Sequence, residues 1–103
     1  MQFEESANGQ IAKVKLGATF DIVLPEIRTA GYRWVLTAGS APTCSLLEDT
    51  IQPNPAVGGA GRHRWRFRAT AQGDCEIEFR YARPWDSSSE PDKTFRLKVQ
   101  VRP

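Results

Sequence analysis

The feature that most constrains the fold of this chain is a two-residue alternation of apolar and polar side chains, which recurs along most of its length. Successive side chains of a β-strand point to opposite faces of a sheet, so this pattern predicts strands that bury one face. No stretch keeps the i, i+3, i+4, i+7 apolar spacing of an amphipathic helix. We therefore expect no α-helix longer than two turns.

Six segments carry the alternation clearly, and a seventh, residues 45–48, carries it weakly. The six clear segments are residues 12–16, 19–24, 32–37, 62–69, 74–81 and 94–101. Glycine- and proline-containing stretches separate them, and alternation with one apolar face is typical of antiparallel sheets. The sequence therefore predicts an all-β fold, an immunoglobulin-like antiparallel β-sandwich of about seven strands.

The length and composition predict a single domain. The chain has 103 residues, of which 40% are hydrophobic and 25% charged, close to globular averages. We expect residues 11–103 to form one β-sandwich domain and residues 1–10 to be a loose N-terminal segment. No run of about 18 apolar residues is present, and no basic region followed by an apolar block begins the chain, so the sequence shows neither a membrane helix nor a signal peptide.

Composition also narrows the chemistry. A net charge of +2 gives no argument for nucleic acid or a membrane surface as the partner. One His and two Cys are too few for a Cys/His zinc site, and nothing indicates a cofactor. Residues 87–89 are serines, but no Gly-x-Ser-x-Gly motif surrounds them and the carboxylates are scattered. We therefore expect neither a metal site nor enzymatic activity.

The two cysteines, Cys44 and Cys75, allow three interpretations. The favoured one is a pair of small buried hydrophobic side chains, the usual environment of free cysteine. The second is a disulfide, which would stabilise the fold by roughly 3 kcal/mol. The third and weakest is a catalytic thiol served by His63, because Cys75 lies inside an alternating strand, a poor place for an exposed nucleophile.

Four arginines alternate along residues 62–68 and form what we call the arginine ladder. Such a ladder can bind phosphates or an RNA strand. It can also be a solvated outer face, with Asp21 and Glu48 from neighbouring strands nearby. The second interpretation is favoured, because no aromatic side chain shares the face of the ladder for bases to stack on.

The connections between strands are the strongest candidates for a binding site. Residues 26–32, 55–61 and 83–86 join strands that, in an immunoglobulin-like order, all end at one pole of the sandwich. The second of these is glycine-rich and can approach another backbone closely. The third presents Trp85 after Pro84, which fixes φ and lowers the entropy cost of presenting an anchor residue.

At these segments the sequence resembles the chagasin-type inhibitors of papain-like cysteine proteases. The family is marked by an Asn-Pro-Thr-Thr-Gly-Tyr-x-Trp segment, a Gly-x-Gly-Gly-type loop and an Arg-Pro-Trp segment. Residues 29–34, Thr-Ala-Gly-Tyr-Arg-Trp, resemble the first, residues 57–61, Val-Gly-Gly-Ala-Gly, the second, and residues 81–85, Tyr-Ala-Arg-Pro-Trp, the third. Ile27, Arg28 and Ala30 depart from the pattern, standing where the family usually has Asn, Pro and the second Thr.

The resemblance implies a reversible, non-covalent inhibitor that occludes the cleft of a papain-like cysteine protease with three loops. It implies a monomer when free, and a partner that is neither nucleic acid nor membrane. Export to the periplasm or secretion is favoured, with a cytoplasmic location left open. The alternative is a β-sandwich adhesion or carbohydrate-binding module that uses Trp85 as a stacking platform. The implied protease-binding residues are Thr29, Ala30, Gly31, Tyr32, Gly58, Gly59, Ala60, Gly61, Arg83, Pro84 and Trp85.

Overall fold

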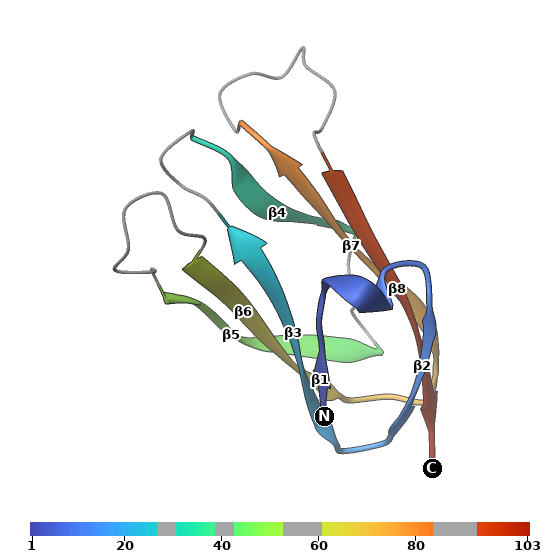
Figure 1. Cartoon of the computed structure of the whole chain (residues 1–103). Coiled ribbons are helices and arrows are strands. Elements are labelled where there is room, and N and C mark those ends of the chain that lie inside the picture. The colour runs from blue at the N-terminus through green and yellow to red at the C-terminus, as the bar shows by residue number, and fades with distance from the viewer. Residues whose placement is uncertain (27–30, 39–42, 53–60, 84–92) are drawn as a thin grey trace.

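Two four-stranded sheets pack face to face in the computed structural model of this chain (Figure 1). The structure describes residues 1–26, 31–38, 43–52, 61–83 and 93–103. In the first sheet the strand order is β1 (Gln2–Phe3), β3 (Thr19–Glu26), β6 (Gly61–Ala69) and β5 (Cys44–Gln52). In the second sheet the order is β2 (Ile11–Lys15), β8 (Lys93–Arg102), β7 (Gly73–Ala82) and β4 (Arg33–Ala38).

The prediction of an immunoglobulin-like β-sandwich is confirmed, with eight strands in place of about seven. The pairs of β3 with β6, β5 with β6, β4 with β7 and β7 with β8 are antiparallel, as the one-sided alternation predicts. The weak segment at residues 45–48 is part of the nine-residue strand β5, where a register shift between Leu46 and Glu48 interrupts the alternation. Within the described residues the helical structure is the 3-10 turn η1 (Glu5–Ala7), and no helix there is long and apolar enough to cross a membrane.

The N-terminal segment differs from the expectation that residues 1–10 are loose. Strand β1 pairs in parallel with β3, and β2 pairs in parallel with β8, so residues 1–15 cross from one sheet to the other. The ring of Phe3 packs edge-on against Phe20, with ring centroids 6.1 Å apart, and Ala7 lies in the core. These two apolar side chains and the backbone pairing tie the segment down, although it is too short to show a periodic pattern.

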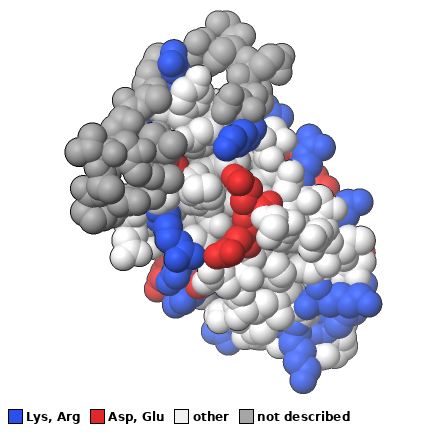
Figure 2. All heavy atoms as spheres, in the orientation of Figure 1, with Lys and Arg blue, Asp and Glu red and all other residues white. Residues whose placement is uncertain are grey.

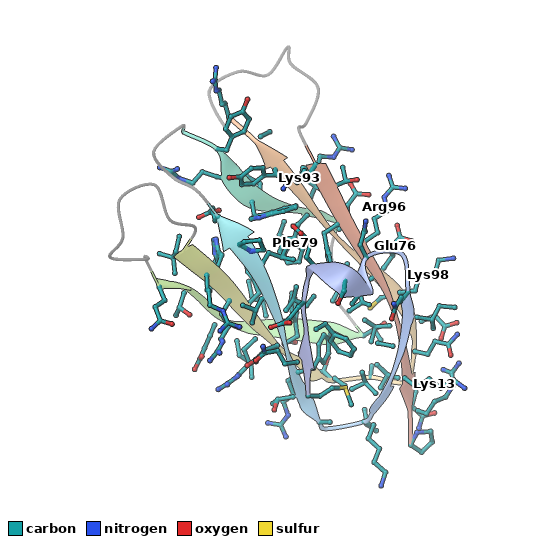
Figure 3. All side chains as sticks on the ribbon, in the orientation of Figure 1. Lys13, Glu76, Phe79, Lys93, Arg96 and Lys98 are labelled. Carbon is teal, nitrogen blue, oxygen red and sulfur yellow. The ribbon has the colours of Figure 1, made fainter. Side chains whose placement is uncertain are left out.

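The core lies between the sheets and is built from the alternating apolar positions. Trp34 and Trp65 both point inward, as expected, with exposed fractions of 5% and 1%. The ring of Trp65 packs against Phe79 at 4.2 Å between centroids, which joins β6 to β7 across the sandwich. Figure 3 shows Phe79 between the two sheets, whereas Glu76, Arg96, Lys98 and Lys13 follow the outer side of the second sheet.

The outer face of the first sheet pairs the arginine ladder with carboxylates. Arg66 donates from Nε to Asp21 at 2.8 Å, and its Nη1 lies 3.8 Å from Glu48. Arg64 and Arg62 lie within 3.7 Å and 3.3 Å of Asp21 and Glu4. Figure 2 likewise shows acidic side chains among the basic ones on the visible face. This pairing supports the structural interpretation of the ladder over a phosphate-binding one.

The two cysteines meet at the pole of the sandwich where the chain ends. Cys44 begins β5 and is fully buried, and its Sγ lies 3.9 Å from the Sγ of partly buried Cys75 on β7. Both thiols are free in the structure, in agreement with the favoured interpretation. Burial away from water raises the pKa of Cys44 to about 12, with Cys75 a further cause, so this thiol is a poor nucleophile.

Candidate functional site

The strand ends that flank three connections lie at the same pole of the sandwich, and the connections themselves, residues 27–30, 53–60 and 84–92, lie outside the described residues. The strand ends beside them are held together within each sheet, because Glu26 is paired with Gly61 and Arg33 with Ala82. Figure 1 shows the ends of β3, β5 and β6 next to those of β4, β7 and β8 at this pole. The arrangement expected from an immunoglobulin-like order is therefore present.

The structure describes four of the eleven residues expected to bind a protease. These four are Gly31, Tyr32, Gly61 and Arg83. The other seven lie outside the described residues: Thr29, Ala30, Gly58, Gly59, Ala60, Pro84 and Trp85. The geometry of the site is therefore that of the strand ends that carry the three connections.

Gly31 and Tyr32 lead from the first connection into β4. Gly31 has φ of +82°, a left-handed conformation that costs a residue with a Cβ roughly 1–2 kcal/mol. The turn at this residue therefore requires glycine. Tyr32 follows it and is partly buried, with its ring stacked on Tyr81 of β7 at 5.4 Å between centroids.

Arg83 extends the same stack from the third connection. Its guanidinium carbon lies 4.9 Å from the centroid of the Tyr32 ring, within the range of a cation–π interaction. The Trp34 ring contacts the Tyr81 ring at 4.9 Å. Trp34, Tyr81, Tyr32 and Arg83 thus form a continuous stack from the core to the surface, and this stack connects the first and third connections.

Gly61 has a different environment from the one expected. It is buried, and it is the first residue of β6, where its partner in register is Glu26 of β3. Its backbone is thus already part of the sheet. Of the glycine-rich segment at residues 57–61, residues 57–60 lie outside the described residues.

A buried carboxylate lies directly under the first connection. Glu26 ends β3 with an exposed fraction of 1%, and its Oε1 accepts a hydrogen bond from the backbone N–H of Trp34 at 2.7 Å. The indole N–H of Trp34 donates to the carbonyl oxygen of Pro25 at 2.8 Å. Two hydrogen bonds therefore close the stem of the first connection, from the end of β3 to the start of β4.

His63 joins this stem to the second connection. Its Nδ1 lies 3.2 Å from Glu26 Oε1, and its Nε2 lies 2.5 Å from Asp49 Oδ1 on β5. The imidazole ring stacks on Trp65, with centroids 3.8 Å apart. Because both ring nitrogens face carboxylates, His63 does not serve either cysteine, and the catalytic-thiol interpretation has no support from its geometry.

The trio of Glu26, His63 and Asp49 is not among the sites that the sequence predicts. Glu26 falls in the first predicted connection, residues 26–32, although it continues the inward positions of Ile22 and Leu24 on β3. The sequence does contain one sign of a buried carboxylate, which is a polar residue at a position that continues the apolar face of a strand. The described residues contain no group of three His, Cys, Asp or Glu side chains placed to hold a metal ion.

This chain is similar to known peptidase inhibitors in sequence. The family model described as chagasin family peptidase inhibitor I42 matches residues 13–99. Amoebiasin-1 of Entamoeba histolytica is 30% identical over 104 aligned residues, which cover 99% of this chain and 100% of that protein.

Solved structures show the same fold. The cysteine protease inhibitor EhICP2 from Entamoeba histolytica superimposes with a TM-score of 0.87 at 23% identity, over 98% of this chain and 93% of that one. The solution structure of Amebosin gives 0.78 at 26% identity, over 99% and 97% of the two chains. PbICP-C, solved in complex with falcipain-2, gives 0.74 at 19% identity, over 99% and 90%.

Proposed function

This chain belongs to the chagasin family of peptidase inhibitors, and on that premise we propose that it inhibits papain-like cysteine proteases by occluding the active-site cleft. The inhibition is reversible and non-covalent. The partner class agrees with the similar structures, of which one is described as a cysteine protease inhibitor and another was solved with falcipain-2. The chain itself acts as an inhibitor and not as an enzyme.

The observation that supports the proposal is that the strand ends flanking the three connections lie together at one pole of the sandwich. The first connection is tied to the second through Glu26 and His63, and to the third through Tyr32 and Arg83. Three segments that are held together on strands can enter one cleft as a unit. Much of the conformational entropy of these segments is then lost when the domain folds, so less is lost when the protease binds.

Each connection has a proposed role in the cleft. Residues 29–31 lie over the catalytic Cys and His of the protease. Residues 58–60 form backbone hydrogen bonds with one wall, because glycine leaves the N–H and C=O groups accessible. Residues 83–85 lie on the other wall, with Trp85 against an aromatic side chain of the protease. Binding of this kind needs no covalent bond and no metal.

The expected strength follows from the size of such interfaces. Protein inhibitors of proteases bury about 1,600 Å² in total, and an area of that order supports nanomolar binding, about −12 kcal/mol. Replacement of the usual Asn, Pro and Thr by Ile27, Arg28 and Ala30 changes the central connection. We propose that these three replacements adjust which proteases are bound, because they change the loop that covers the reacting groups.

The test is a titration of a papain-like cysteine protease with the purified domain, alongside a trypsin-like serine protease as the class control. The expected result is loss of peptide hydrolysis by the cysteine protease at one inhibitor per enzyme. Activity should return on dilution, and mass spectrometry should show the inhibitor uncleaved and without a covalent adduct. No inhibition at micromolar inhibitor, or equal inhibition of the serine protease, would contradict the proposal. Binding to glycans in the same preparation would favour the carbohydrate-binding alternative.

A further inference from the structure

We propose that the outer face of β2 and of the last residues of β8 binds a linear anionic polysaccharide. This surface, which we call the basic patch, consists of Lys13, Lys15, Lys98 and Arg102. The proposal goes beyond the inhibitory function above, because it gives the chain a second partner at a separate surface. Only the last of its measurements depends on inhibition.

Strand pairing places the four basic side chains close together on one face. β2 and β8 are paired in parallel, with Lys15 opposite Arg102 and Lys13 opposite Gln100. Residues two apart on a strand share a face at a spacing of roughly 7 Å, and paired strands lie about 5 Å apart. All four basic side chains are exposed. Figure 3 shows Lys13 and Lys98 on the outer side of the second sheet, and Figure 2 shows basic side chains gathered at the lower right of the view, over these strands.

The basic patch lacks the neutralisation found on the other sheet. There, three arginines of the arginine ladder each contact a carboxylate. The three lysines of the basic patch form no ion pair with any residue that the structure describes, and Arg102 contacts Asp74 at 3.2 Å. Glu76 is opposite Lys98 in register without an ion pair between them. The carboxylates therefore lie on the β7 side of the patch, and its β2 side has none.

This arrangement is electrostatically unfavourable in the free chain. Lys15 and Arg102 are partners in register, and like charges at such positions repel each other. The segments that join strands at this pole, residues 16–18, 39–42 and 70–72, contain no Asp or Glu. An anionic partner would remove the repulsion, and its binding would be favoured further by release of the counterions of the polyanion.

The side chains of this face favour a polysaccharide among the possible polyanions. Single-stranded nucleic acid is bound by stacking of bases on aromatic rings, and the outward positions of β2 and β8 hold no aromatic residue. Binding to a lipid surface needs apolar side chains that enter the bilayer, whereas the exposed Ile11 is shorter than the lysines beside it. A row of cations with the amide of Gln100 suits the sulfate, carboxylate and hydroxyl groups of a sugar chain.

The basic patch is far enough from the three connections for both partners to bind at once. β8 runs from Lys93, beside the third connection, to Arg102 at the pole where the chain ends (Figure 1). Nine steps of roughly 3.3 Å separate these two residues by about 30 Å, and Lys98 lies about halfway between them. A bound polysaccharide therefore leaves the strand ends that flank the connections accessible to a protease.

The experiment measures binding of the chain to dextran sulfate over a range of salt concentrations, with uncharged dextran as the reference. The wild-type chain should bind dextran sulfate and not dextran, and its affinity should fall steeply as salt rises. The double variant Lys13→Gln, Lys15→Gln should bind roughly 10- to 30-fold more weakly at about 50 mM salt. The matched control is Arg64→Gln, Arg68→Gln, which removes the same charge from the first sheet and should weaken binding by less than about 3-fold.

Three outcomes would overturn the proposal. The first is an equal loss of binding in the two double variants, because binding would then follow net charge alone. The second is stronger binding to phosphatidylserine vesicles or to duplex DNA than to dextran sulfate. The third concerns the repulsion between Lys15 and Arg102. Lys13→Gln, Lys15→Gln should keep or raise the melting temperature, so a clearly lower one would contradict this repulsion.

A last measurement tests whether the two surfaces are separate. The inhibition constant of the wild-type chain against a papain-like cysteine protease is measured with and without saturating dextran sulfate, and the protease with dextran sulfate alone is the reference. The two constants should agree. Loss of inhibition on addition of dextran sulfate would show that the polysaccharide reaches the inhibitory pole. Absence of inhibition under both conditions would contradict the inhibitory function alone, because the binding measurements contain no protease.

Discussion

The guanidinium of Arg83 lies over the ring of Tyr32, 4.9 Å from its centroid. Arg83 follows the last residue of β7, and Tyr32 precedes the first residue of β4, so the contact joins two connections that are about fifty residues apart in sequence. Both residues belong to segments expected to bind a protease. The contact therefore links the described ends of these two segments in the free chain.

A double-mutant cycle with Arg83→Ala and Tyr32→Leu tests this contact. The leucine retains apolar surface on Tyr81 and removes the π-face. We expect a coupling free energy of about 0.5–1 kcal/mol in the inhibition constant, as for a cation–π pair at an exposed site. Strictly additive effects would show that Arg83 and Tyr32 act independently.

Trp85 is the residue on which the inhibitory proposal depends most. Trp85→Ala should weaken protease binding by about 2 kcal/mol or more, as for other aromatic anchors. It should lower the free energy of unfolding by less than about 1 kcal/mol. Trp65→Ala is the matched control, because removal of this buried side chain should cost about 3–5 kcal/mol of stability. A Trp85→Ala variant that melts much earlier yet still inhibits would contradict the anchor role.

The first connection departs from the family pattern at Ala30. Ala30→Thr restores the hydroxyl of the Thr-Thr-Gly pattern, and should preserve or improve inhibition of common papain-like enzymes. A hydrogen bond gained there is worth about 0.5–1.5 kcal/mol. The measurement is the inhibition constant of both forms against the same enzyme. Clear loss of affinity in the threonine variant would mean that this chain docks its first connection differently.

The two cysteines should titrate as free thiols that are slow to react in the folded protein. Burial raises the pKa of both side chains, that of Cys44 to about 12, so little thiolate is present at neutral pH. A thiol reagent should therefore react slowly with the native chain, and rapidly with two thiols after denaturation without reductant. Fewer than two thiols in the denatured sample would show that the cysteines are bridged.

Stability should fall in acid because of two carboxylates on the outer faces. Hydrogen bonds from Arg66 lower the pKa of Asp21, and hydrogen bonds from Thr37 and then Arg80 lower that of Glu78. A carboxyl whose pKa is lower in the folded state stabilises the fold above its unfolded value of about 4. That contribution disappears as pH falls through the folded value.

Thermal unfolding between about pH 7 and pH 2 measures this effect. Asp21→Asn should lower the melting temperature at neutral pH and reduce its decline in acid, because the variant has no carboxyl at this position to protonate. Lys13→Gln is a suitable control, since it alters a charge on the other sheet without touching Asp21. An acid decline that is the same in Asp21→Asn and the wild type would contradict the assignment.

The sequence by itself determined the strands and their buried faces. Alternate side chains of a strand face opposite sides of the sheet. The inward positions of Trp34, Trp65 and Phe79 could therefore be predicted from the alternation within each strand. The pairing of the arginine ladder with Asp21 and Glu48 also followed, once the strand order was known. The placement at one pole of the strand ends that flank the three connections followed from the same order.

Only the tertiary structure decided the contacts between residues far apart in the chain. Strand β1 has two residues, too few for a periodic signal, and exists because β3 offers an edge to pair with. Glu26 is polar and precedes a loop, and its burial depends on partners 8 and 37 residues away, Trp34 and His63. Whether a polar side chain is solvated or enclosed depends on such distant neighbours, and periodicity within a strand carries no information about them.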